Sequence, residues 1–144
     1  MTNKTQSDSA AVPKMPAAVA QCFDQISPQH RARFFSLRDQ IFGVAAADSR
    51  IGDIEEALRW NEPAYLTSAS KSGSTIRLGM EKTSNQPALF FNCQTSLVET
   101  FRQQFGKTLR YVKNRAVLLD ADTSETETAL RHCIHAALTY HLRD

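Results

Sequence analysis

The sequence predicts an α+β domain in which an antiparallel sheet packs against helices. The chain has 144 residues, a length that fits a single domain. Apolar residues make up 42% and charged residues 22%, which is typical of a globular protein. Helical patterns lie towards both ends of the chain, and strand patterns with short connections lie between them. This order favours antiparallel pairing and the α+β class.

The N-terminal part predicts a tail and two helices. Residues 1–15 are polar and predict a disordered tail, which leaves 16–144 as a single domain. Apolar residues with helical spacing predict a first helix over Ala17–Ile26. Ser27 and Pro28 then suit the N-cap and the first turn of a second helix, whose pattern ends before Asp48.

The middle of the chain predicts strands, with one ambiguous segment at its start. Over residues 54–60 the apolar side chains fit either a helical turn or an alternating strand, and Pro63 should end either one. Ala64–Thr67 predicts a short strand. Ser74–Met80 alternates cleanly, so Arg77 should lie on the face opposite Ile76, Leu78 and Met80. Residues 87–93 are apolar on both faces and predict a central strand.

The C-terminal part predicts a helix, a hairpin and a final helix. Ser96 with Glu99 and Ser124 with Glu127 both have the spacing of a capping box, which predicts a helix start at each serine. Between these helices, residues 109–112 and 116–119 predict a hairpin.

Charge, cysteine content and hydropathy limit the function classes. The net charge of +2 is too weak to indicate nucleic-acid binding, so we expect no nucleic-acid partner. The three cysteines have no short spacing, which favours reduced thiols and a cytoplasmic location. No apolar run has the length of a membrane span, so we expect no membrane partner.

The segment from Trp60 to Tyr65 provides the main candidate binding site. It places the only tryptophan, the carboxylate of Glu62 and a tyrosine around a proline turn, a combination that suits a ligand pocket or equally a corner of the core. Arg77 could grip a carboxylate on the same sheet face. We therefore predict that Trp60, Glu62, Tyr65 and Arg77 bind a small polar or anionic ligand, or a protein partner.

Two further chemistries have candidate residues. Glu55, Glu56 and Glu62 could bind a hard metal ion, although Arg59 lies among them and favours a surface ion pair. Cys93, near a strand end, could act as a nucleophile, although a buried packing role is favoured because no partner base is evident.

The segment Ile54-x-Glu56-Ala-Leu-Arg-Trp60-x-x-Pro63-x-Tyr65 resembles the opening signature of domain-of-unknown-function family 1801, the YdhG-like family. Ser74–Gly79 and Ala88–Phe91 look like its signature strands, and the similarity covers about residues 28–142. The resemblance implies an α+β fold with a curved antiparallel sheet backed by helices, and no established reaction. One branch is regarded as a frataxin-like iron chaperone, so an iron-binding role is the alternative function. The pI near 8.5 departs from the acidic surface which that role uses.

Overall fold

A computed structural model describes residues 12–142 and confirms the α+β class. The described part contains four α-helices and six strands, which run in chain order as α2 (Ala17–Asp24), α3 (Pro28–Ala47), β1 (Glu55–Arg59), β2 (Glu62–Leu66), β3 (Ile76–Glu81), β4 (Gln86–Phe90), α4 (Leu97–Phe105), β5 (Tyr111–Val112), β6 (Ala116–Leu118) and α5 (Ser124–Leu138). None of these helices is long and apolar enough to cross a membrane.

The six strands form one antiparallel sheet in the order β1-β2-β3-β4-β6-β5. The ambiguous segment at 54–60 is a strand, in which Glu56 pairs with Tyr65. The prediction that Pro63 ends this region was wrong, since Pro63 lies inside β2 opposite Leu58. Proline is tolerated there because β2 begins to pair with β3 only at Ala64.

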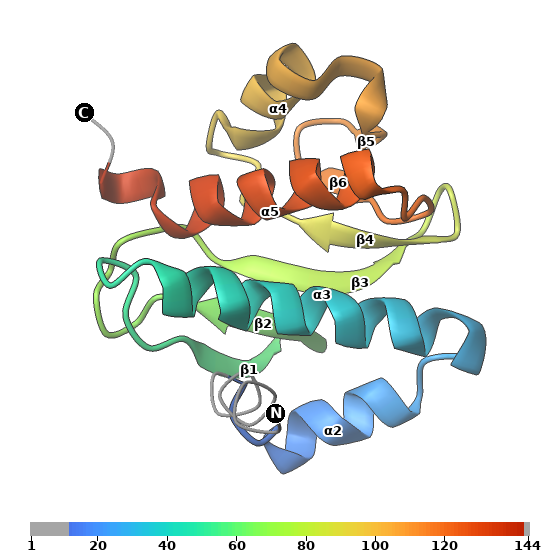
Figure 1. The fold of residues 1–144 in the computed structure, drawn as a ribbon. Helices are drawn as coiled ribbons and strands as arrows, with labels where there is room; N and C mark the ends of the chain where they lie inside the picture. Colours follow the sequence, from blue (N-terminus) through green and yellow to red (C-terminus); the bar gives the residue numbers. More distant parts are fainter. Residues whose placement is uncertain (1–11, 143–144) are drawn as a thin grey trace, which may run out of the picture.

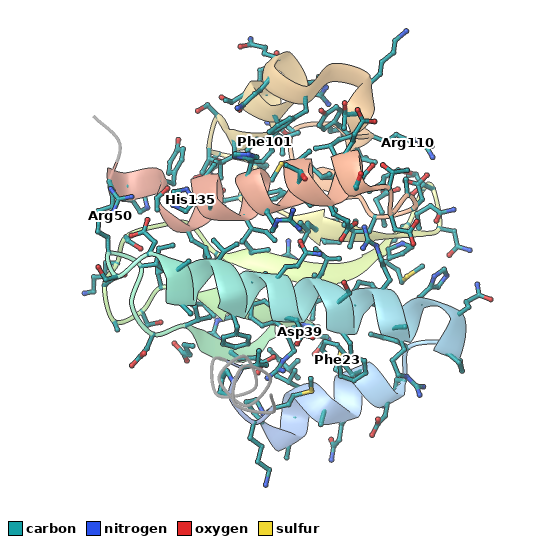
Figure 2. The ribbon with its side chains drawn as sticks, in the orientation of Figure 1. Phe23, Asp39, Arg50, Phe101, Arg110 and His135 are labelled. Carbon is teal, nitrogen blue, oxygen red and sulfur yellow. The ribbon has the colours of Figure 1, made fainter. Side chains whose placement is uncertain are left out.

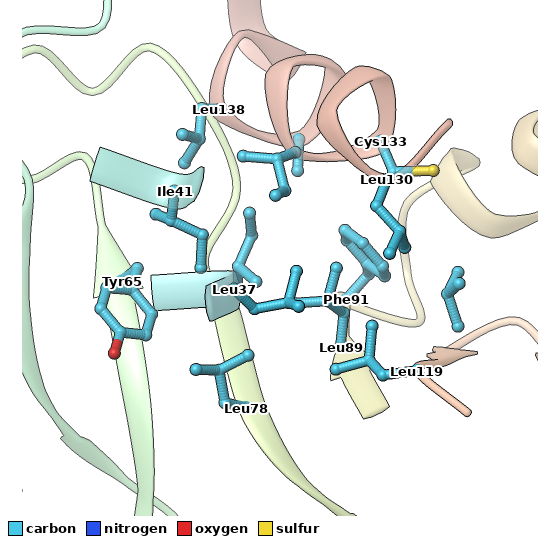
Figure 3. Packing of buried hydrophobic residues seen from close by; sticks show 14 of the residues in the cluster. Leu37, Ile41, Tyr65, Leu78, Leu89, Phe91, Leu119, Leu130, Cys133 and Leu138 are labelled. Atoms are coloured by element: carbon cyan, nitrogen blue, oxygen red, sulfur yellow. The ribbon is translucent and has the colours of Figure 1, made fainter. Parts of the chain in front are cut away.

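Within residues 12–142, the helices lie on one face of the sheet. Helices α3 and α5 lie side by side across it, with α2 near β1 and α4 near β5 and β6 (Figure 1). Buried side chains from all four helices join Tyr65, Leu78 and Leu89 in one core cluster on this helix face (Figure 3). A second buried cluster contains strand residues alone, among them Ala88, Phe90 and Leu118. We call the sheet face that carries this second cluster the open face.

The helix starts differ from the capping boxes that the sequence predicts. The side chains of Ser27 and Ser96 make no capping hydrogen bond. The last helix is capped one residue earlier than predicted, by Thr123, whose Oγ1 accepts a hydrogen bond from the Thr126 N–H at 3.1 Å. Glu127 does not complete a box, because its carboxylate is held by a side chain of α3.

Part of the predicted tail packs against the domain. Val12 and Met15 contact the core cluster, and the carbonyl oxygen of Pro13 accepts a hydrogen bond from Arg38 at 2.7 Å. The prediction of disorder was therefore wrong for residues 12–15. Residues 1–11 lie outside the described part of the chain.

Candidate functional site

A two-residue turn presents Trp60 at the tip of the β1–β2 hairpin. Trp60 and Asn61 both have a positive φ, of 55° and 62° respectively, which is the pattern of the tight hairpin turn that matches strand twist. The Trp60 side chain is 84% exposed, although burying an indole is strongly favourable. The fold therefore displays this ring rather than packing it.

Glu62 and Arg77 form an ion pair on the open face. The Nη1 group of Arg77 donates to Glu62 Oε1, and both side chains are about a quarter exposed, at 27% for Arg77 and 26% for Glu62. The Arg77 guanidinium also stacks over the Phe90 ring, with its central carbon 5.3 Å from the ring centroid. Gly79 leaves room for the pair, since a Cβ atom there would lie 2.2 Å from Glu62 Oε2.

Arg115 reaches onto the same face from the β5–β6 hairpin. Its backbone carbonyl accepts a hydrogen bond from the Phe91 N–H at 2.7 Å, and the neighbouring Asn114 amide donates to the Cys93 carbonyl at 2.9 Å. These bonds hold the hairpin against the loop that follows β4. The Arg115 side chain is 48% exposed and lies 3.8 Å from a Glu81 oxygen, which is a long and weak contact.

The open face is hollowed where these arginines gather. A cavity of about 500 Å³ is lined by residues from both hairpins, β3 and the loop after β4, among them Arg59, Trp60, Arg77, Asn92, Cys93 and Arg115. None of its described lining residues is acidic, and Glu62 is the carboxylate that holds Arg77 from beside it. Three guanidinium groups around one hollow favour an anionic ligand, because a guanidinium binds carboxylate or phosphate in two places.

Tyr65 does not belong to this site, which corrects the prediction that grouped it with Trp60 and Arg77. Tyr65 is fully buried on the helix face, where its ring meets the core (Figure 3). Its hydroxyl donates to Glu56 Oε2 at 2.9 Å. Burial, helped by the nearby Glu56 carboxylate, raises the pKa of Tyr65 far above its usual value. Tyr65 is therefore a structural hydrogen-bond donor.

Glu56 is the acceptor of a buried network that the sequence did not reveal. Arg38 of α3 donates to it twice, at 2.6 Å and 2.9 Å, and these charged side chains are only 6% and 3% exposed. Donating these hydrogen bonds to the Glu56 carboxylate raises the pKa of Arg38. Arg38 lies on the apolar stripe of its helix, which is the signal that could have marked a buried arginine in need of a carboxylate.

The three glutamates proposed as metal ligands do not converge. Glu55 accepts a hydrogen bond from Ser68, Glu56 is held by Arg38 on the helix face, and Glu62 is held by Arg77 on the open face. Over residues 12–142 no three histidine, cysteine or acidic side chains are grouped closely enough to hold a metal ion. The predicted ion pair with Arg59 was also wrong, because Arg59 donates instead to the Leu58 carbonyl at 2.9 Å.

The cysteines occupy three different environments. Cys93 is exposed in the loop after β4, which corrects the prediction that it is buried, and it lines the arginine-rich cavity. No histidine lines that cavity among the described residues, so no side-chain base is placed beside the thiol. Cys22 of α2 is half-buried. Cys133 of α5 is buried, and burial raises the pKa of its thiol.

Comparison of the chain with protein-family models, curated proteins and solved structures finds no match. The resemblance to family 1801 therefore stays a prediction.

A cluster that contains a histidine lies on the helix face, at the end of α3 and α5. His135 Nε2 lies 2.9 Å from Asp48 Oδ2, and Arg50 donates to the same carboxylate at 2.8 Å. Figure 2 shows Arg50 and His135 at this end of the two helices. The hydrogen bond from Arg50, and to a smaller extent that from His135, lowers the pKa of Asp48 well below its usual value. The cluster closes a helix end and leaves the carboxylate fully engaged.

Proposed function

We propose that this chain is a non-catalytic binding module that holds a small anionic ligand in the cavity of the open face. The observation that carries the proposal is the gathering of Arg59, Arg77 and Arg115 around one hollow of about 500 Å³. That volume suits a metabolite rather than a polymer. The ligand class is a carboxylate or phosphate compound, because these anions match the planar guanidinium fork.

Other features of the cavity support binding rather than catalysis. Trp60 offers an exposed aromatic surface against which a flat or apolar part of the ligand can pack. The described lining contains neither a histidine nor a carboxylate positioned for proton transfer. The proposal places the module in the cytoplasm, where its three free cysteines stay reduced.

Isothermal titration with di- and tricarboxylates, sugar phosphates and nucleotides tests the proposal. We expect at least one of these anions to bind the wild type, and we expect Arg77→Ala and Arg115→Ala each to weaken its binding about tenfold or more, the loss of a charge-assisted hydrogen bond. Arg131→Ala is the matched control, because it removes the same charge from an exposed residue of α5.

The control variant should change the affinity less than twofold. Equal weakening by Arg131→Ala would show a general charge effect rather than a site. If no anion in the panel binds the wild type more tightly than it binds Arg77→Ala, the proposal is wrong.

A further inference from the structure

We infer that Glu62 is an internal competitor that occupies Arg77 until an anionic ligand displaces it. This inference rests on the proposed function and adds a regulatory element to it. In the structure, the Glu62 carboxylate takes the position on Arg77 that a ligand carboxylate or phosphate would take. The ligand therefore exchanges one oxyanion for another on a preformed guanidinium.

The geometry around the pair fits such an exchange. Phe90 supports the Arg77 guanidinium from one side, at 5.3 Å, so the cation keeps its position when its partner leaves. Glu62 is the first residue of β2 and lies beside Gly79. Its carboxylate occupies space that only a glycine leaves free. Both side chains are about a quarter exposed, so the carboxylate can swing into water at little cost because water replaces the contact that it loses.

The other two arginines of the cavity are not held in this way. Arg59 donates to the carbonyl of its own neighbour in sequence. Arg115 is 3.8 Å from its nearest carboxylate partner, Glu81, whose oxygens already accept hydrogen bonds from Thr83 and Ser84. An anion can therefore bind first to Arg59 and Arg115, and it gains Arg77 when Glu62 moves away.

Protonation of Glu62 should have the same effect as its displacement. In the described part of the chain three cations face Glu62, and they are Arg77 of β3, Lys82 of the following turn and Arg59 of β1. The Cys22 thiol of α2 is the titratable group that also faces it. Burial raises the pKa of Glu62 above its ordinary value despite the opposing effect of Arg77 and Lys82. A neutral Glu62 releases Arg77, so the affinity for anions should rise as the pH falls through this pKa.

The test uses sulfate, because the charge of this dianion does not change between mildly acidic and neutral pH. Sulfate is titrated into the intact chain, and binding is followed by calorimetry or by amide chemical shifts. Glu62→Gln keeps the shape of the side chain and removes its charge. We expect it to tighten sulfate binding about fivefold, the effect of losing one partly exposed ion pair. Glu125→Gln, which makes the same change in net charge at an exposed site on α5, should change the affinity less than twofold.

The pH dependence gives a second readout, and its first part needs only the wild-type chain. For the wild type, sulfate affinity should rise between neutral and mildly acidic pH, and this rise should be lost in Glu62→Gln. If Glu62→Gln binds sulfate no more tightly than the wild type, while Arg77→Ala abolishes binding, the competitor role is wrong and the binding site stands. If Arg77→Ala also leaves sulfate binding unchanged, both proposals are wrong.

Discussion

Two arginine–glutamate pairs lie on opposite faces of the sheet, and they differ in how completely they are enclosed. On the helix face, Arg38 and Glu56 are 6% and 3% exposed, and Tyr65 donates a further hydrogen bond to the same carboxylate. On the open face, Arg77 and Glu62 are 27% and 26% exposed beside a cavity. The chemistry of the two pairs is the same, so the difference in their roles comes from burial.

Burial decides whether a partner can be exchanged. Removing one member of an enclosed pair leaves a charge with neither water nor a counterion, which is strongly unfavourable. A pair at the surface costs little to open, because water replaces the lost contact. The pair of the helix face is therefore costly to break, whereas the pair of the open face can open at little cost.

The largest expected effect follows from breaking the enclosed pair. Glu56→Ala leaves Arg38 buried without its carboxylate, and it should lower the free energy of unfolding by about 3–5 kcal/mol in urea denaturation. Glu62→Ala should lower it by about 1 kcal/mol or less. Comparable losses for the two variants would contradict the contrast between the faces.

A double replacement separates the pair from the charge that it leaves behind. Arg38→Met with Glu56→Leu removes both buried charges and keeps apolar bulk in their place, so it should be less destabilising than Glu56→Ala alone. If the double variant is as unstable as Glu56→Ala, the loss of the pair itself, rather than the charge left behind, accounts for most of the fall in the free energy of unfolding.

Two glycines provide the next contrast. A Cβ atom on Gly73 would lie 2.3 Å from the Ala137 carbonyl oxygen at the end of α5, whereas one on Gly79 would meet the movable carboxylate of Glu62. Gly73→Ala should therefore lower the free energy of unfolding by about 1–3 kcal/mol, because backbone must shift. Gly79→Ala should cost less than about 1 kcal/mol. Thermal and urea unfolding of both variants check this order, and the reverse order would contradict it.

The most buried and the most exposed cysteine allow the effect of burial to be compared with the same substitution. Cys133→Ser places a hydroxyl in the fully buried core and should lower the free energy of unfolding by about 1–3 kcal/mol. Cys93→Ser changes an exposed loop and should stay within about 0.5 kcal/mol of the wild type. Because Cys93 has no catalytic task in this account, its replacement should also leave anion affinity within twofold. A tenfold loss would show that the thiol contributes directly to anion binding.

The smallest effect is expected at the hairpin tip. Trp60 holds a positive φ of 55°, a conformation that glycine adopts without steric cost. Trp60→Gly should therefore leave stability unchanged or raise it by about 1 kcal/mol or less, as measured by urea denaturation. A loss greater than 1 kcal/mol would show that the exposed ring stabilises the fold instead of serving the cavity.

Local periodicity was enough to predict several features of the fold and the site. The alternation of Ser74–Met80 placed Arg77 opposite Ile76 and Leu78, and the structure confirms that arrangement. The order of helices and strands was enough for the α+β class. Ser27 and Ser96 do stand at the predicted N-cap positions. The cap of the last helix was placed one residue too late, because the adjacent hydroxyl residues Thr123 and Ser124 fit a helix start almost equally well.

The composition of the cavity could not be predicted, because it depends on contacts between distant segments. Arg115 reaches the open face only because its hairpin is bonded to the loop after β4. Tyr65 was grouped with Glu62 although the two are three residues apart in β2, and side chains at that spacing lie on opposite faces of a strand. The partner of Glu56 is 18 residues away, on a helix that the local sequence does not connect to it.

Anion binding at the open face is tested most directly by mapping amide chemical shifts during a sulfate titration of the wild-type chain. If the anion binds in the cavity of the open face, we expect the largest shifts at Arg59, Arg77, Asn92 and Arg115. The amides of α3 and α5 should stay unperturbed. Shifts centred on the helix face, for example around His135, or shifts spread evenly over the surface, would contradict the claim that the open face is the binding site.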